Sequence, residues 1–206
     1  MPDSIPPPRS LILVAGLFEA SLAAVAIVLG WLFGYPPYQQ AVWSASALGL
    51  GVLASLVPLL AACAIVVVPW RPFREMLRVA DEMVGPLFRE ASILDLALVA
   101  ILAGFGEEML FRGVLQTALA GWLGGAAGPW IALGLTSILF GLLHLITPTY
   151  AVIAGLIGLY LGWLQLAGGN LVLPIAAHAA YDFLALVYVV RVRLPRAAAP
   201  PPQDMP

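Results

Sequence analysis

The chain has 206 residues, of which 62% are hydrophobic and only 10% are charged, and its mean hydropathy is +1.00. Soluble domains carry about 25% charged residues, so this composition excludes an ordinary soluble domain and indicates an integral membrane protein. The net charge is −2 and every basic residue is Arg, so no basic surface for nucleic acid is expected. The apolar runs reach the roughly 20 residues of a spanning helix and show no strand-like alternation, which predicts an all-α membrane protein.

The N-terminal region predicts two membrane spans. Residues 1–10 are rich in Pro and are predicted to be disordered. Residues 11–33 form an apolar run longer than the roughly 7–15 residues of a signal-peptide core, so we expect it to be retained. A short loop at 34–38 leads to a second span at 41–68. Cys63 is the single cysteine, which excludes an intrachain disulfide, and we expect it to pack inside the protein.

An amphipathic helix is predicted at residues 70–91. Its apolar residues recur at helical spacing, at Phe73, Met76, Leu77, Ala80, Met83, Val84 and Leu87. Arg and acidic residues occupy the other positions, so we expect this helix to lie on the cytoplasmic surface of the membrane.

The C-terminal half predicts four further spans. They cover residues 92–120, 129–146, 149–167 and 171–190. We treat 92–190 as a catalytic four-span core and 11–91 as a separate N-terminal region, and we expect the tail at 191–206 to be disordered. Gly158 and Gly162 are spaced as in small-xxx-small patterns, which favour close helix packing.

Six spans place both termini on one side of the membrane. Eight Arg residues fall on that side, namely Arg9, Arg71, Arg74, Arg78, Arg89, Arg191, Arg193 and Arg196. The opposite loops carry no charge and are flanked by the interfacial aromatics Trp31, Tyr35, Tyr38, Trp43, Trp122, Trp130 and Trp163. The positive-inside rule therefore predicts cytoplasmic termini.

Charged residues inside the third span point to function. Ionised side chains are costly at membrane depth and usually face a cavity or a partner. On a helix, Glu108 and Arg112 are i,i+4 neighbours in the favourable order for an ion pair. Glu107 is rotated by about 100° from Glu108, which leaves one acid free for chemistry. The alternative interpretation is a purely structural ion pair beside a packing acid.

Two further polar sites interrupt the apolar pattern. His144 lies near the end of the fourth span, and His178 and Asp182 lie one turn apart in the sixth. Two imidazoles, several carboxylates and a guanidinium fit a hydrolytic site with a base for water and donors for the oxyanion. Each His alone could instead be a hydrogen-bonding packing residue. Glu19 and Asp95 are lesser candidates, which we interpret as structural.

The polar sites share an order and a spacing with a known family. They are Glu107-Glu108-xxx-Arg112, Phe140-xxx-His144 and His178-xxx-Asp182. Together they resemble the three motifs of the CPBP family, the CAAX prenyl protease type 2 and bacteriocin-processing (Abi-type) membrane proteins. The resemblance covers residues 92–190. It implies an intramembrane endopeptidase for membrane-anchored proteins or peptides, in a bacterial or archaeal cell membrane, with Glu108 and Arg112 holding the helix turn.

The resemblance also implies roles for the other motif residues. Glu107 would activate water, His144 and His178 would assist the oxyanion or bind a metal, and Asp182 would support them. Family members commonly have Asn where this chain has Asp182, and an ionised Asp cannot donate a hydrogen bond as Asn can. Zinc or another divalent cation on His144, His178 and one carboxylate, Glu107 or alternatively Asp182, would match catalytic zinc sites, and this convergence of ligands favours a metal. A metal-free route, with Glu107 as the base, is also adequate.

Two other classes of function stay open from the sequence. One is a membrane scaffold or bacteriocin-immunity protein that retains the motif residues for folding or binding. The other is a small-solute or proton carrier, although no second acidic turn in residues 1–90 suggests the repeat symmetry of a transporter. A question of depth also arises, since Glu107 lies about 22 Å along its helix while His144 is near a span end. A bend at Gly104–Gly106, a tilt or a shorter third span would bring them together.

Overall fold

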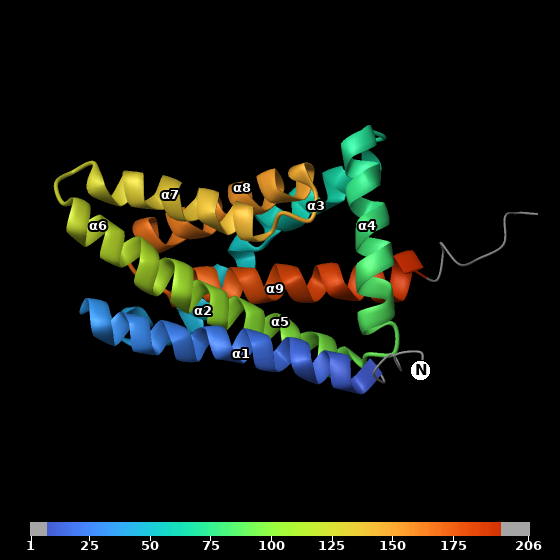
Figure 1. Cartoon of the computed structure of the whole chain (residues 1–206), viewed down its shortest axis with the longest axis horizontal. Helices are drawn as coiled ribbons and strands as arrows, with labels where there is room; N and C mark the ends of the chain where they lie inside the picture. Colours follow the sequence, from blue (N-terminus) through green and yellow to red (C-terminus); the bar gives the residue numbers. More distant parts are fainter. Residues whose placement is uncertain (1–7, 195–206) are drawn as a thin grey trace, which may run out of the picture.

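The computed structural model describes residues 8–194, and within this range every regular element is helical. Long helices run roughly side by side along one axis, and α4 (Arg71–Phe88) crosses the end of this bundle (Figure 1). The prediction of an all-α membrane protein is therefore confirmed. The predicted tails at 1–10 and 191–206 fall largely outside the described residues, but helix begins already at Pro8 and continues to Arg193.

The N-terminal region supplies two long helical runs. Its elements are α1 (Pro8–Phe33), the 3₁₀ turn η1 (Pro37–Gln40), α2 (Ala45–Ala54) and α3 (Leu56–Val67). Ser44 caps α2 because its side-chain oxygen accepts from the backbone N–H of Ala47. The predicted span at 41–68 thus starts later, at Ala45, and is interrupted at Ser55. Cys63 is exposed on α3, so its predicted packing role was wrong.

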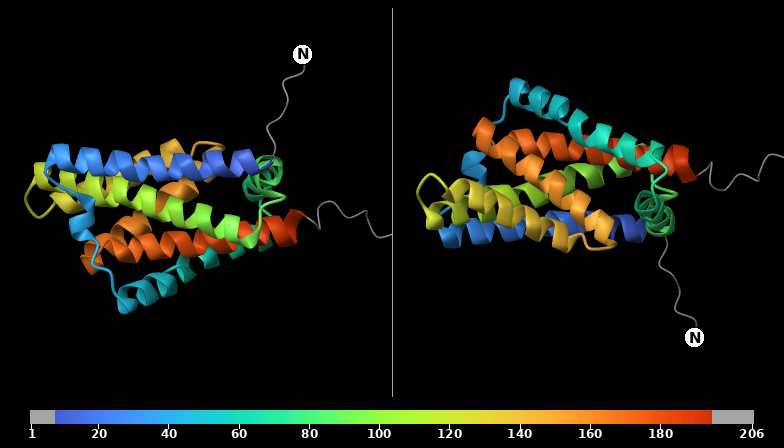
Figure 2. Two further views of the ribbon diagram at one scale, coloured as in Figure 1. Left: turned by 90° about the horizontal axis from the view of Figure 1, so that it is seen from below. Right: turned by 90° about the horizontal axis from the view of Figure 1, so that it is seen from above.

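The surface helix predicted at 70–91 is present as the shorter α4, Arg71–Phe88. It lies across the bundle end where α1 begins and the chain's last described helix ends (Figure 2). The Arg193 guanidinium binds both carboxylate oxygens of Asp81, at 2.7 and 2.8 Å. Arg191 also donates to the backbone carbonyls of Arg89 and Ala91. These contacts attach the last helical turn of the chain to α4 and to the turn that follows it.

The C-terminal half forms the core of the bundle. Its elements are α5 (Ile93–Glu108), the π-helical η2 (Met109–Gln116), α6 (Thr117–Leu123), α7 (Gly128–Leu143), α8 (Pro148–Gly168), α9 (Val172–Tyr188) and the π-helical η3 (Val189–Arg193). A reciprocal cap between Ser92 and Asp95 begins α5, which confirms a structural role for Asp95. The segments α5, η2 and α6 follow one another without a gap in the sequence.

Four helical runs are long and apolar enough to cross a membrane by length and composition. They are Leu11–Phe33, Ala45–Val67, Pro148–Gly168 and Val172–Arg193. The other two segments of the predicted six are α7, which is apolar but has only 16 residues, and the run from α5 to α6, which carries the charged turn. The chain is therefore a multi-pass membrane protein.

Both ends of the described chain lie at the α4 end of the bundle (Figures 1 and 2). The turn after α6 and the connection from α8 to α9 lie at the opposite end. Gly124 and Gly169 begin these connections with positive φ angles of 62° and 60°, which glycine adopts without strain. This arrangement agrees with an even number of spans, whereas the cytoplasmic orientation of the termini stays a prediction.

Two glycines let α5 pack tightly between its neighbours. A Cβ atom on Gly104 would lie 2.7 Å from the backbone nitrogen of Ala179 in α9. A Cβ atom on Gly106 would overlap the backbone carbonyl oxygen of Glu19 in α1. Gly104 and Gly106 thus mark helix crossings, and the α-helix continues through both of them. The backbone departs from α-helical geometry later, in the π-helical segment that begins at Met109.

Candidate active site

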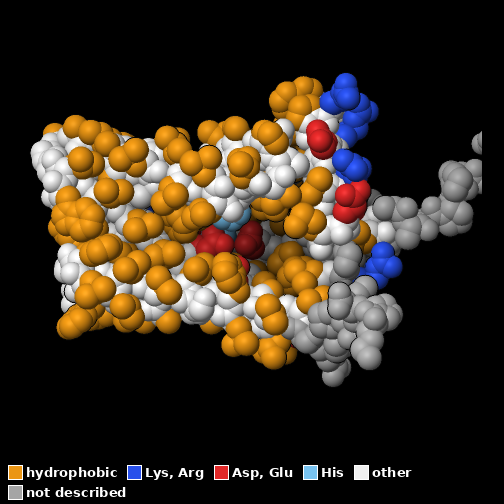
Figure 3. All heavy atoms as spheres, in the orientation of Figure 1, with side chains coloured by type: hydrophobic (Ala, Val, Ile, Leu, Met, Phe, Trp, Pro, Cys, Tyr) orange, Lys and Arg blue, Asp and Glu red, His pale blue; other side chains and the backbone are white. Residues whose placement is uncertain are grey.

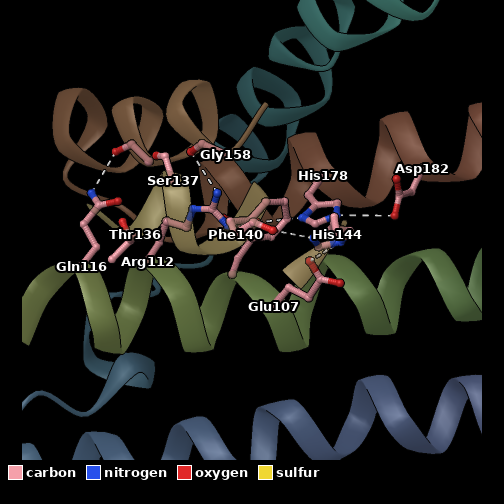
Figure 4. A network of polar contacts seen from close by, with 12 residues as sticks. Glu107, Arg112, Gln116, Thr136, Ser137, Phe140, His144, Gly158, His178 and Asp182 are labelled. Carbon is pink, nitrogen blue, oxygen red and sulfur yellow. Dashed lines mark hydrogen bonds and ion pairs between the residues drawn. The ribbon is translucent and has the colours of Figure 1, made fainter. Parts of the chain in front are cut away.

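A chain of buried charged groups crosses the centre of the bundle. One carboxylate oxygen of Glu108, Oε1, accepts from Arg112 Nη1 at 2.8 Å and from His178 Nδ1 at 2.7 Å. The other ring nitrogen of His178, Nε2, lies 3.4 Å from Asp182 Oδ2 (Figure 4). Glu108, Arg112 and His178 are 0%, 1% and 2% exposed. Burying these charges is tolerable because each meets an opposite or hydrogen-bonding partner.

The Arg112 guanidinium is fixed from three sides. Besides Glu108 it contacts the backbone carbonyl of Gly158 in α8, to which Nη2 donates at 2.9 Å. Its Cζ lies 4.6 Å from the ring centroid of Phe140 in α7, a cation–π contact. A Cβ atom on Gly158 would approach Arg112 Nη2 to 3.2 Å, so the absence of a side chain there leaves room for the guanidinium. The backbone carbonyl of Gly162 plays the same part for Gln116 as that of Gly158 for Arg112, since it accepts from Gln116 Nε2 at 3.0 Å.

Glu107 and His144 face each other beside this buried chain. Glu107 is the residue before Glu108, and its side chain is 12% exposed. Its Oε2 atom lies 4.0 Å from His144 Nε2 (Figure 4). His144 Nδ1 is 2.8 Å from the carbonyl oxygen of Phe140, which can only accept, so Nδ1 carries a hydrogen and Nε2 faces Glu107. A separation of 4.0 Å is too long for a direct hydrogen bond and fits a bridging water.

The depth question raised by the sequence has a simple answer. Helix α7 ends at Leu143, three residues before the predicted span end at 146. His144 is the first residue after the helix. The chain then turns and α8 begins at Pro148. His144 therefore reaches the level of Glu107 because α7, the fourth span, is short. The explanations considered from the sequence concerned the third span instead.

The site lies at the bottom of a hollow in one face of the bundle. Figure 3 shows acidic and His side chains together there, inside an otherwise apolar surface. Two aromatic residues that the sequence analysis did not select border the imidazoles. The Tyr181 ring stacks on His178 at 5.2 Å, and the Tyr150 ring centroid is 6.1 Å from that of His144. Tyr181 stands one residue before Asp182, and this neighbourhood was its only sequence signal.

The predicted metal ligands do not form a metal site as placed here. Among the described residues, no group of three or more His, Cys, Asp or Glu side chains is arranged to hold a metal ion. His178 offers the physical reason, because both of its ring nitrogens already face carboxylates. A ring nitrogen of His178 could bind a metal only by giving up one of these two contacts. The metal content of the protein stays a prediction.

Comparison with known proteins agrees with the motifs. Residues 89–184, just under half of the chain, match the family model described as "Type II CAAX prenyl endopeptidase Rce1-like". This match confirms the resemblance to the CPBP family and covers every motif residue. The chain is also 35% identical over 103 residues to the uncharacterized protein YpbD of Bacillus subtilis (strain 168), a match spanning 47% of this chain and 46% of that protein. The chain thus covers about half the length of that relative. No solved structure matches the chain.

Proposed function

We propose that this protein, whose residues 89–184 match a family model of CAAX prenyl endopeptidases, is an intramembrane endopeptidase for membrane-anchored proteins or peptides. The observation that carries the proposal is the approach of Glu107 Oε2 to His144 Nε2, at 4.0 Å inside a membrane bundle. This pair presents a carboxylate and an imidazole nitrogen to the same small space. That space opens to the hollow seen in Figure 3.

Glu107 is the general base in this proposal. Its carboxylate takes a proton from a water molecule, and the oxygen of that water forms a bond to the carbonyl carbon of the peptide. The proton then passes to the leaving amine nitrogen as the C–N bond breaks, which yields a carboxylic acid and an amine. Glu107 suits this role better than Glu108, because Glu108 is completely buried and already bonded to Arg112 and His178.

His144 stabilises the negative charge that develops on the carbonyl oxygen. Its Nδ1–H is committed to Phe140, so the ring orientation is fixed and only Nε2 faces the substrate. When both ring nitrogens carry a proton, Nε2–H donates to the oxyanion.

The buried chain from Arg112 to Asp182 positions these two groups. His178 bonds Glu108 at 2.7 Å and thereby ties α9 to the helical turn that carries Glu107. Asp182 faces His178 Nε2, so the carboxylate needs only to accept. An ionised Asp182 can accept a hydrogen bond in this position, whereas it could not donate one to an oxyanion. We propose the metal-free route, in which Glu107 is the base.

The test is hydrolysis of a defined membrane-anchored peptide. Purified protein in liposomes would be incubated with a farnesylated CAAX peptide and with the same peptide carrying a non-prenyl acyl anchor, and products would be identified by mass spectrometry. We expect cleavage by the wild type and a loss of at least a hundredfold in Glu107→Gln, at normal folded yield. A scaffold or immunity protein would cleave neither peptide, and its biological effect would survive the Glu107→Gln substitution.

A further inference from the structure

Glu19 lies against the active site although it belongs to α1, outside the matched segment 89–184. Its backbone carbonyl packs on Gly106, the residue before Glu107, where a side chain on Gly106 would overlap it. The preceding residues Leu17 and Phe18 are both 60% exposed on the outer surface, whereas Glu19 is half-buried. The acid therefore sits on the inward face of α1, directly beside the turn that carries the proposed base.

One oxygen of the Glu19 carboxylate also receives no hydrogen bond from the described residues. Its Oε2 atom is buried and unpaired among the described residues, and so is Oε2 of Glu107. Glu19 is close enough to Glu107, His178 and Asp182 to interact with each electrostatically. Buried polar atoms without partners are rare and commonly mark a bound water or a functional group. Here three such oxygens, Oε2 of Glu19, Glu107 and Glu108, belong to carboxylates of one site.

We propose that Glu19 is a further residue of this site, which together with Glu107 orients the hydrolytic water. A water molecule has two O–H donors, and each unpaired carboxylate oxygen accepts one of them. Glu107 removes the hydrogen that it accepts, while Glu19 keeps the other and so fixes the direction of the oxygen lone pairs. Glu19 neither gains nor loses a proton in the reaction. This inference rests on the proposed function for its reaction, but the water position can be tested without it.

The position of the other polar groups supports this division of roles. Of the remaining acids near Glu107, Glu108 is bonded to Arg112 and His178, and Asp182 faces His178 from α9. His144 approaches Glu107 from the end of α7, where the substrate carbonyl would lie. Oε2 of Glu108 is also buried without a partner, but Glu108 is held in the buried chain because its Oε1 bonds both Arg112 and His178. Within the described part of the site, Glu19 is the further acid that α1 supplies.

Two substitutions of Glu19 separate a water-orienting role from a structural one. Glu19→Leu keeps the approximate side-chain size but removes the acceptor, whereas Glu19→Gln keeps one carbonyl acceptor. Using the farnesylated CAAX peptide in liposomes, we expect Glu19→Leu to lower kcat by at least about tenfold with KM within twofold of the wild type. Glu19→Gln should keep most of the wild-type kcat. Ser21→Ala, at an exposed position two residues along α1, is the control and should change neither constant.

A high-resolution structure of the wild type provides the second, activity-independent readout. We expect a water molecule within hydrogen-bond distance of both Glu19 Oε2 and Glu107 Oε2. Wild-type kcat in Glu19→Leu, or a Glu19 side chain turned away from Glu107 in that structure, would overturn the inference. If the wild type cleaves neither anchored peptide, the proposed function fails, and the structure alone then decides whether Glu19 and Glu107 share a water.

Discussion

Glu108 and His178, 70 positions apart in the chain, share a 2.7 Å hydrogen bond in the buried centre of the bundle. This bond joins the helical run that carries the charged turn to the helix that carries the third motif. Because Glu108 Oε1 also accepts from Arg112, one oxygen atom connects three of the seven motif residues. The site is therefore assembled around Glu108, while the chemistry that we propose is performed by its neighbour Glu107.

The first prediction separates these two adjacent acids by stability. Glu108→Ala leaves Arg112 and His178 buried without their shared acceptor, so it should destabilise the protein by about 3–5 kcal/mol. Glu107→Gln keeps the size of the side chain and removes none of the hydrogen bonds of the buried chain, so its unfolding temperature should stay close to that of the wild type. Thermal unfolding in detergent measures both. Equal unfolding temperatures for the two variants would contradict the assignment of Glu108 as the structural acid.

The second prediction concerns the space around Arg112. Gly158→Ala places a methyl group 3.2 Å from both Arg112 Nη2 and the Phe140 ring, so we expect a lower unfolding temperature and reduced peptide cleavage. Gly134→Ala in α7 is the matched control, since a Cβ atom there meets nothing within 4 Å. Both changes favour helix formation equally. The difference between the two variants therefore reports the Arg112 contact, and no difference would mean that the guanidinium shifts freely.

The third prediction is the membrane orientation. Reporter fusions within the connections at Gly124–Gly125 and at Gly169 should lie on the non-cytoplasmic side, since these turns are at the bundle end away from α4 (Figure 1). A fusion at Glu82, in α4, should report the cytoplasm, where the Arg residues are expected. A cytoplasmic signal at Gly125 would break the six-span topology.

The fourth prediction concerns metal. Since the described residues present no three-ligand group, we expect the purified protein to keep its activity after chelation and to contain less than one equivalent of zinc. Elemental analysis and cleavage assays before and after chelation measure this. The sequence alone favoured the opposite result. One equivalent of metal that disappears in both His144→Ala and His178→Ala would show that the side chains rearrange around an ion.

Much of the fold follows from local sequence. Apolar runs of spanning length and the amphipathic spacing of residues 73–87 predicted the helices to within a few residues, because hydrophobic periodicity is a local property. The i,i+4 spacing likewise predicted that Glu108 would pair with Arg112 and that His178 would face Asp182.

Contacts between helices could not be read in this way. The sequence places Glu107, His144 and His178 on three helical segments, and it contains no local signal for which nitrogen meets which carboxylate. The tertiary structure decided that His178 is enclosed by Glu108 and Asp182. It also brought Glu19, which the sequence left as a structural acid, against Gly106. The physical reason is that periodicity fixes which face of a helix is polar, whereas packing across glycines and helix ends decides what that face meets.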